Sequence, residues 1–152
     1  MGLLDLLLPE SARMKTPDCY PMPGNYAAGD FKEPDRVIFE ARKGDLLEYL
    51  RDENERHWSV FVGCPIKKCY VIHYSRDKDD KSADPVKKEE FYAVAGKSKM
   101  RVNNETDIKH KPLEPNDIVE RAERSIGKTE SHVFWDSSDQ FAKWCRHGYL
   151  DI

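Results

Sequence analysis

Residues 57–74 read HWSVFVGCPIKKCYVIHY and carry the clearest structural signal in the chain. Two runs rich in β-branched and aromatic residues, 58–62 and 69–74, are separated by a short segment that contains Gly63 and Pro65. Such runs are typical of strands, and Gly and Pro between them are typical of a turn. The sequence therefore predicts an antiparallel hairpin over residues 57–74.

The residues before and after this hairpin divide into strands and loops. Residues 37–39 and 45–50 are rich in apolar and aromatic side chains, so we expect strands there. Residues 76–88 read RDKDDKSADPVKK, and we expect them to form a solvated surface loop. Residues 10–35 are rich in Pro and Gly and are expected to form an extended, loop-rich arm.

A first helix is predicted after residue 115. Ile118, Ala122 and Ile126 recur at helical spacing. Asn116 is its expected N-cap, and Gly127 follows its expected end.

A second helix is expected to begin at residues 136–139, which read DSSD. Short polar side chains of this kind are favoured at helix N-termini. Phe141, Trp144 and Cys145 follow at positions i, i+3 and i+4 and form an apolar stripe. Strands followed by helices favour an α+β fold with an antiparallel sheet packed against helices.

The composition limits the classes of protein to which the chain can belong. Of its 152 residues, 39% are hydrophobic and 35% are charged, and the net charge is −3, which is typical of one globular domain. The apolar stretches are shorter than the ~20 residues of a transmembrane helix, and no basic excess indicates a nucleic-acid partner. We therefore expect neither a transmembrane segment nor nucleic-acid binding.

The cysteines and the amino terminus bear on the cellular compartment. Residues 1–9 lack a basic stretch and no cleavage site follows, so we expect no signal peptide and a cytoplasmic location. Cysteines in such a chain are more often thiols than disulfides, and we expect thiols at Cys64 and Cys69. With His73 they are one ligand short of a structural zinc site. Cys145 is expected in the core, and no metal ion or cofactor is predicted.

His57 and His73 lie on the two predicted strands of the hairpin, where cross-strand neighbours come into contact. Each histidine alone is compatible with a structural role. A histidine base oriented by a second polar group, and facing a nucleophile at a helix N-terminus, is the general plan of a cysteine acyl-transfer site. The helix N-terminus stabilises a thiolate, but Ser138 occupies that position here.

Several short blocks of the sequence resemble one known family. Gly44–Glu48, 57–63 and 71–73 are similar to the lecithin:retinol acyltransferase-like (LRAT) family. Further blocks resemble its HRAS-like suppressor branch of phospholipases A and phospholipid acyltransferases: 86–89, 94–96, 101–104, 112–113 and 121–127. The resemblance implies a permuted papain-like (NlpC-type) domain over residues 37–149, preceded by the arm at 1–36 and followed by a short end at 150–152.

The nucleophile motif of this family is Asn-Cys-Glu-His-Phe, and a Gly follows seven residues after the Phe. Phe141 and Gly148 keep that spacing, so the motif falls on residues 137–141. The resemblance thus places Ser138 at the position of the catalytic cysteine. The segment 138–148 also resembles LRAT-domain proteins that lack this cysteine.

The resemblance further implies that His57 is the general base and that His73 orients it. A hydroxyl is far less acidic than a thiol and forms no resting ion pair with an imidazole, so we expect activity lower by several powers of ten. Three explanations of Ser138 stay open: a natural non-catalytic member, a natural serine enzyme, and a cysteine changed on purpose. Ser137 and Gln140, which replace Asn and His of the motif, favour natural change.

We therefore expect a catalytically impaired protein, a pseudoenzyme, that binds a lipid or a protein partner. Its expected ligand is a phospholipid or an acyl chain, with peripheral contact to a membrane. The alternative is an active phospholipid acyltransferase or phospholipase A that forms an acyl-enzyme at Ser138. Membrane-bound members of the family continue into a hydrophobic helix, whereas the sequence given ends at Ile152, so we expect weak anchoring.

Overall fold

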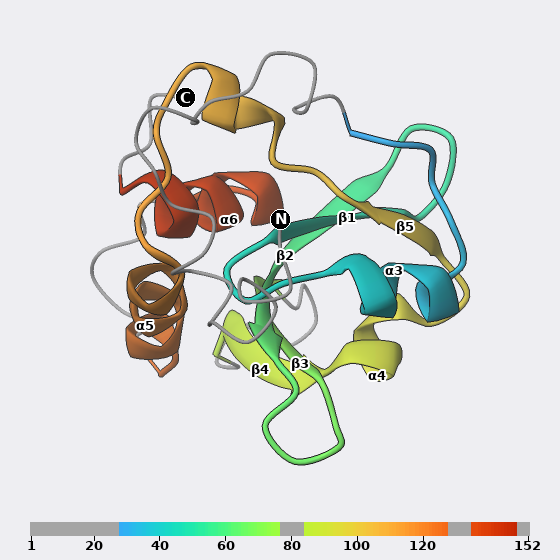
Figure 1. Cartoon of the computed structure of the whole chain (residues 1–152), viewed down its shortest axis with the longest axis horizontal. Coiled ribbons are helices and arrows are strands. Elements are labelled where there is room, and N and C mark those ends of the chain that lie inside the picture. Colours follow the sequence, from blue (N-terminus) through green and yellow to red (C-terminus); the bar gives the residue numbers. More distant parts are fainter. Residues whose placement is uncertain (1–27, 77–83, 128–134, 149–152) are drawn as a thin grey trace, which may run out of the picture.

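A computed structural model of the chain describes residues 28–76, 84–127 and 135–148. In these ranges five strands form one antiparallel sheet, in the spatial order β4-β3-β2-β1-β5 (Figure 1). The strands are β1 (Leu46–Leu50), β2 (Arg56–Gly63), β3 (Tyr70–Tyr74), β4 (Val86–Glu90) and β5 (Lys99–Val102).

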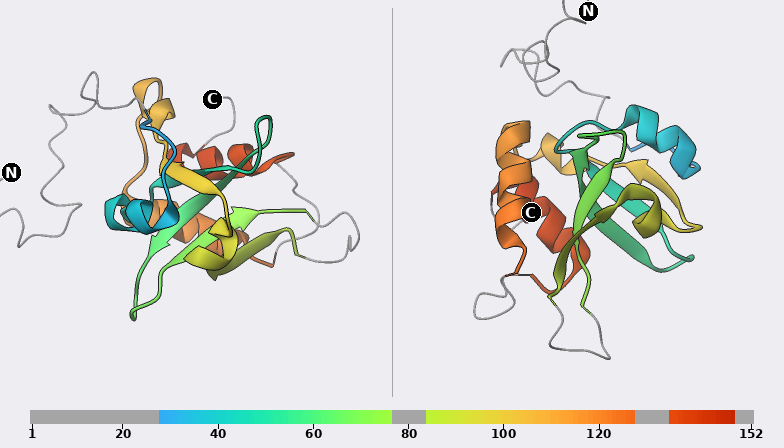
Figure 2. Two further views of the ribbon diagram at one scale, coloured as in Figure 1. Left: turned by 90° about the vertical axis from the view of Figure 1, so that its right-hand side faces the viewer. Right: turned by 90° about the horizontal axis from the view of Figure 1, so that it is seen from below.

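Helices cover both faces of this sheet (Figure 2). One face packs against α5 (Pro115–Ser125) and α6 (Ser138–His147), and the other packs against α3 (Pro34–Glu40) and α4 (Phe91–Ala95). A short 3₁₀ helix, η2 (Glu105–Ile108), follows β5. The α+β class, with an antiparallel sheet packed against helices, is confirmed.

The sheet separates two apolar cores because side chains alternate between its faces. Trp58 and Val60 of β2 belong to the core under α5 and α6. Phe61 belongs to the core on the other face, together with Tyr49 of β1. The predicted hairpin over 57–74 is confirmed, since β2 and β3 pair in antiparallel register.

The strand predicted at residues 37–39 is wrong, because these residues belong to helix α3. Pro34 stands in the first turn of the helix, where its fixed φ is favourable, and Asp35 follows at the positive end of the helix dipole. Val37 is fully buried whereas Phe39 is 88% exposed. Only one side of the segment is therefore covered, as in a surface helix.

The loop predicted at 76–88 is also partly wrong, because Val86 begins strand β4. β4 pairs with β3 from Tyr70↔Glu90 to Tyr74↔Val86. Its side chains are mostly polar, so β propensity does not predict a strand there. Strand pairing uses the backbone, however, and Val86 is almost fully buried. Residues 77–83 lie outside the described residues, as does most of the predicted arm.

The two carboxyl-terminal helices are confirmed, although the cap of the first differs. Helix α5 begins at Pro115 and has Glu114 at its N-cap, so the prediction of Asn116 as N-cap is wrong. Pro is favoured in the first turn, where its missing N–H costs nothing. Gly127 follows the helix with a φ of +83°, a conformation that glycine adopts readily.

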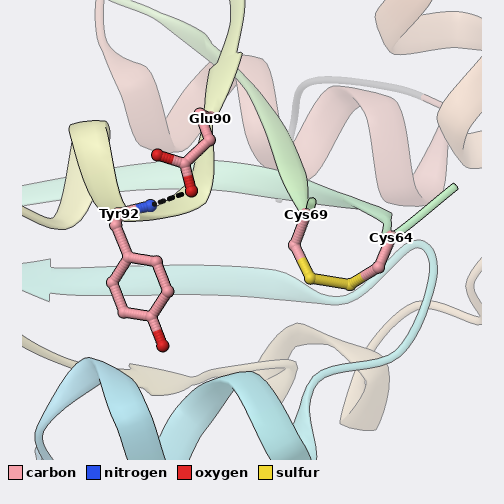
Figure 3. The surroundings of a disulfide bond; sticks show 4 residues. All are labelled: Cys64, Cys69, Glu90 and Tyr92. Carbon is pink, nitrogen blue, oxygen red and sulfur yellow. Dashed lines mark hydrogen bonds between the residues drawn. A yellow bond between two sulfur atoms is a disulfide. The ribbon is translucent and has the colours of Figure 1, made fainter. Parts of the chain in front are cut away.

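The prediction of free thiols at Cys64 and Cys69 is wrong, because the two form a disulfide across the turn of the β2–β3 hairpin (Figure 3). The turn brings together residues that spacing alone does not pair. Cys145 is a fully buried thiol in the core, as predicted. Within the described ranges, no helix has the length and hydropathy needed to span a membrane, and no cluster of ligands suits a metal ion.

Candidate functional site

Three side chains from three neighbouring strands form a hydrogen-bonded row. His57 Nε2 on β2 lies 2.8 Å from His73 Nδ1 on β3. His73 Nε2 lies 2.6 Å from Glu89 Oε2 on β4. The two predicted histidines thus lie side by side, and Glu89 joins them.

The register of the sheet explains this row. His57 lies on the face of Phe61, and His73 on the face of Val71, because each pair is separated by an even number of residues. Glu89 pairs directly with Val71, so its side chain also lies on this face, diagonally across from His73. All three side chains therefore lie on the face opposite to α6.

Burial keeps both histidines neutral at neutral pH. It lowers the pKa of His57 to about 3, and electrostatic interactions with His73 and Arg51 lower it further. Burial also lowers the pKa of His73, and outweighs the opposing effect of the Glu89 carboxylate. Neutral imidazoles can accept a proton, as a general base must.

Tyr49 on the neighbouring strand β1 packs against His57. It pairs with His57 across β1 and β2, and the two ring centroids are 5.6 Å apart. The Tyr49 hydroxyl is held 2.7 Å from Ser59 Oγ in the buried interior. The imidazole of His57 is therefore packed against a fixed aromatic ring.

Ser138 is the first residue of α6, and its hydroxyl does not cap the helix. The N-cap is Ser137, whose side chain makes no capping hydrogen bond. Ser138 Oγ instead accepts a hydrogen bond from the backbone N–H of Trp58, at 3.1 Å. The helix N-terminus is thus joined to strand β2 one residue after His57.

The position of this bond follows from the way the sheet opens. Amides along a strand point alternately to its two neighbours, and the amide of Phe61 points to the β1 side, where it bonds to Asp45. The amide of Trp58 therefore points to the β3 side. The recorded pairing of β2 with β3 stops at Val60↔Ile72, so the Ser138 hydroxyl takes the place of a strand carbonyl there.

Ser138 and His57 approach β2 from different sides. Helix α6 packs on the face of Trp58, whereas the His57 side chain lies on the other face. The Ser138 oxygen reaches the backbone of β2 where the hairpin has separated. Among the described residues no hydrogen bond joins Ser138 to His57, and the role of Ser138 as nucleophile stays a prediction.

A polar cavity of about 260 Å³ lies on the α6 face of the sheet. Trp58 and Lys143 line it, and the Lys143 ammonium lies 5.1 Å from the Trp58 ring centroid. Glu48 also lines the cavity, and its buried carboxylate accepts hydrogen bonds from Arg101 and Asn103. The cavity can therefore hold a polar group next to Trp58.

Sequence reasoning missed two members of the site: the Glu89 carboxylate and the Trp58 amide. The signal for Glu89 is weak, since it lies in the run VKKEE, which looks like a solvated loop. Only the register of β4 on β3 places it beside His73. A backbone amide carries no signal in the sequence at all.

Comparisons with known proteins show the family of the chain. Residues 39–151 match the family described as lecithin retinol acyltransferase. Phospholipase A and acyltransferase 3 of Homo sapiens is 36% identical over 124 residues, which cover 73% of this chain and 74% of that protein. The Mus musculus protein of the same name is 37% identical, with the same coverage. Phospholipase A and acyltransferase 2 of Homo sapiens is 32% identical over 120 residues, which cover 70% of this chain and 71% of that protein. This chain therefore belongs to the lecithin retinol acyltransferase family.

Proposed function

We propose that this protein binds phospholipid acyl esters in a permuted papain-like site and transfers their acyl chains only slowly. The names of its relatives, phospholipases A and acyltransferases, support this class of ligand. The observation that carries the proposal is the hydrogen bond from the Trp58 amide to Ser138 Oγ. It holds the hydroxyl oxygen against the β2 backbone, and among the described residues no hydrogen bond joins this hydroxyl to His57, the base that would take its proton.

The chemistry of serine at this position strengthens the proposal. A cysteine at a helix N-terminus can rest as a thiolate beside a protonated histidine. The low pKa of His57 leaves no such cation at neutral pH, and a hydroxyl would have to lose its proton during attack. We therefore expect acyl transfer slower by several powers of ten than with a thiolate.

A second candidate is an active serine acyltransferase or phospholipase A. The intact row of His57, His73 and Glu89 favours it. Ser138 Oγ would attack the ester carbonyl while His57 takes its proton and then gives it to the departing lysophospholipid oxygen. Water or an amine would next release the acyl chain from Ser138. We also propose that the protein is cytoplasmic and contacts membranes peripherally. A protein partner in place of a lipid is a further proposal.

The test compares the protein with its Ser138→Cys variant on a fluorogenic acyl ester and on phospholipid vesicles. Strong turnover that appears only in the Ser138→Cys variant, and disappears when His57→Ala is added, supports the proposal. Comparable turnover by the serine protein, abolished by His57→Ala, contradicts it and supports the second candidate.

Binding is measured separately, because the proposal requires it even without turnover. A short-chain phospholipid below its micellar concentration is titrated into the protein while tryptophan fluorescence is recorded. A saturable change supports a retained lipid site. No change, together with no turnover in either form, contradicts the proposal.

A further inference from the structure

Glu89 lies at the end of the row that begins at His57, where its carboxylate contacts His73 but not His57. The three residues come from three adjacent strands, and two short contacts of 2.8 and 2.6 Å join them. We propose that Glu89 is a positioning residue, which fixes the tautomers of both histidines and leaves Nδ1 of His57 as the nitrogen that presents a lone pair. This inference rests on the proposed function for its chemical meaning, but not for its geometry.

The assignment begins at the carboxylate, which can only accept hydrogen bonds. Nε2 of His73 must therefore carry a hydrogen in its contact with Glu89. A neutral imidazole has one N–H, so Nδ1 of His73 is an acceptor. It can accept only from Nε2 of His57, which must then carry the hydrogen of that ring.

The same count leaves Nδ1 of His57 without a hydrogen. No described residue forms a hydrogen bond with that atom, so its lone pair is available to a hydroxyl, a thiol or a water molecule. The neutral state on which the count depends is consistent with burial, which lowers the pKa of both histidines. A carboxylate that holds a catalytic histidine in one tautomer is a known device in serine proteases.

Charged groups around His73 oppose one another. Glu89 on β4 raises the pKa of His73, whereas Lys87 on β4 and Arg51 after β1 lower it. His57 on β2 is neutral and contributes a hydrogen bond. Of these groups, only Glu89 offers an acceptor to Nε2 of His73.

The neighbouring residue shows that the position of Glu89 is specific. Glu90 lies on the other side of the strand's pleat, and its side chain accepts a hydrogen bond from the Tyr92 amide at the start of α4 (Figure 3). Glu90 is thus the N-cap of α4, whereas Glu89 is placed by its pairing with Val71 of β3. Two adjacent glutamates thus have different tasks, one at a helix cap and one at the histidine row.

The alternative is that Glu89 makes only a surface ion pair with His73, since its side chain is 42% exposed. Such pairs contribute little to stability and set no tautomer elsewhere. The two interpretations predict different tautomers for His57, which Glu89 does not contact. An effect of Glu89 on the protonation pattern of His57 is therefore the decisive property.

The experiment records long-range ¹H–¹⁵N correlation spectra of the histidine rings at neutral pH, without substrate. In the unaltered protein we expect hydrogen on Nε2 of both His57 and His73. In Glu89→Ala we expect mixed tautomers at both rings. In Glu89→Gln, whose amide oxygen can still accept, we expect a smaller change. Glu123→Gln removes a carboxylate of similar exposure on α5, which pairs with Lys88, and we expect no change.

Two results would overturn the inference: a hydrogen on Nδ1 of His57 in the unaltered protein, or unchanged tautomers in Glu89→Ala. The Gln variant keeps the test decisive if the Ala variant does not fold. The spectra need no turnover, so they separate this inference from the proposed function.

Turnover provides a second readout in the Ser138→Cys background. Adding Glu89→Ala should lower kcat by roughly 10- to 100-fold with little change in KM, as expected when a residue behind a reactive group is lost. Adding Glu123→Gln should leave kcat unchanged. Equal kcat with and without Glu89 would overturn the positioning role.

Discussion

Helix α6 is fixed in different ways at its two ends. At its carboxyl end the Arg146 guanidinium is buried and donates to both oxygens of Asp107, at 2.9 and 2.7 Å. It also donates to the Gly44 carbonyl, and the Arg146 carbonyl accepts from the Leu113 amide. At its amino end, the hydroxyl of Ser138 makes one hydrogen bond to the sheet.

The contacts that position the helix are therefore concentrated at its carboxyl end, whereas the candidate nucleophile lies at its amino end. The carboxyl end combines several buried bonds around charged groups, and these position the helix on the sheet. At the amino end the Ser138 side chain contributes one neutral hydrogen bond, while Phe141 and Ala142 pack in the core, so we expect a change at position 138 to leave the fold intact.

The largest effect is expected at the carboxyl end. Asp107→Ala leaves the Arg146 guanidinium buried without its main acceptor, and we expect a loss of about 3–5 kcal/mol in the free energy of unfolding. Urea denaturation monitored by tryptophan fluorescence measures it. The control is Glu120→Ala, which breaks the exposed pair with Arg124 and should cost less than about 1 kcal/mol. Equal losses would show that the buried pair does not position the helix.

A smaller effect is expected from acid, through the histidine beside the amino end. Burial lowers the pKa of His57 from its usual 6.5 to about 3. Between these values the unfolded chain binds a proton that the folded protein does not, so the free energy of unfolding decreases as the pH falls below 6.5. The slope per group is at most about 1.4 kcal/mol per pH unit.

Denaturation at pH 7, 6 and 5 tests this dependence, because carboxylates titrate mostly below that range. His57→Gln cannot titrate and should have a smaller slope. His73 and His147, whose pKa values burial also lowers, contribute in the same direction and should retain part of it. An unchanged slope in His57→Gln would contradict a buried neutral imidazole.

The smallest effect is expected at the amino end of the helix. Ser138→Ala removes the acceptor of the Trp58 amide and should cost about 1 kcal/mol, the usual value of one neutral hydrogen bond. Ser137→Ala should change stability by less than about 0.5 kcal/mol, because the N-cap hydroxyl makes no capping bond and instead donates to the partly exposed Asp139 carboxylate. Thermal unfolding of the two variants measures the difference. A larger loss of stability in Ser137→Ala than in Ser138→Ala would contradict the assignment of Ser138 as the residue that joins the helix to the sheet.

The sequence predicted the segments in which apolar content and strand pairing coincide. Residues 45–50, 58–62 and 69–74 combine β propensity with burial, and strands β1, β2 and β3 cover all of them except Asp45 and Cys69. Residues 37–39 have the same propensity, yet they form part of a helix because Pro34 starts it and only Val37 is buried. Propensity failed where the tertiary contacts cover only one side of a segment.

The sequence predicted only those parts of the candidate site that lie on strongly patterned strands. His57 and His73 could be paired from the hairpin, because both strands are strongly patterned. Glu89 could not, since its strand is polar and gains its place only by pairing with β3. The Cys64–Cys69 disulfide was missed for a related reason, because a turn geometry and not a spacing brings the two sulfurs together.

The most direct test of the central claim, that the site is retained but lacks a reactive nucleophile, is intact-mass spectrometry after incubation with a phospholipid. The Ser138→Cys variant should gain the mass of one acyl chain, lost again when His57→Ala is added. The serine protein should gain none over the same time. Acylation of the serine protein at Ser138, as fast as that of the Ser138→Cys variant, would contradict the account.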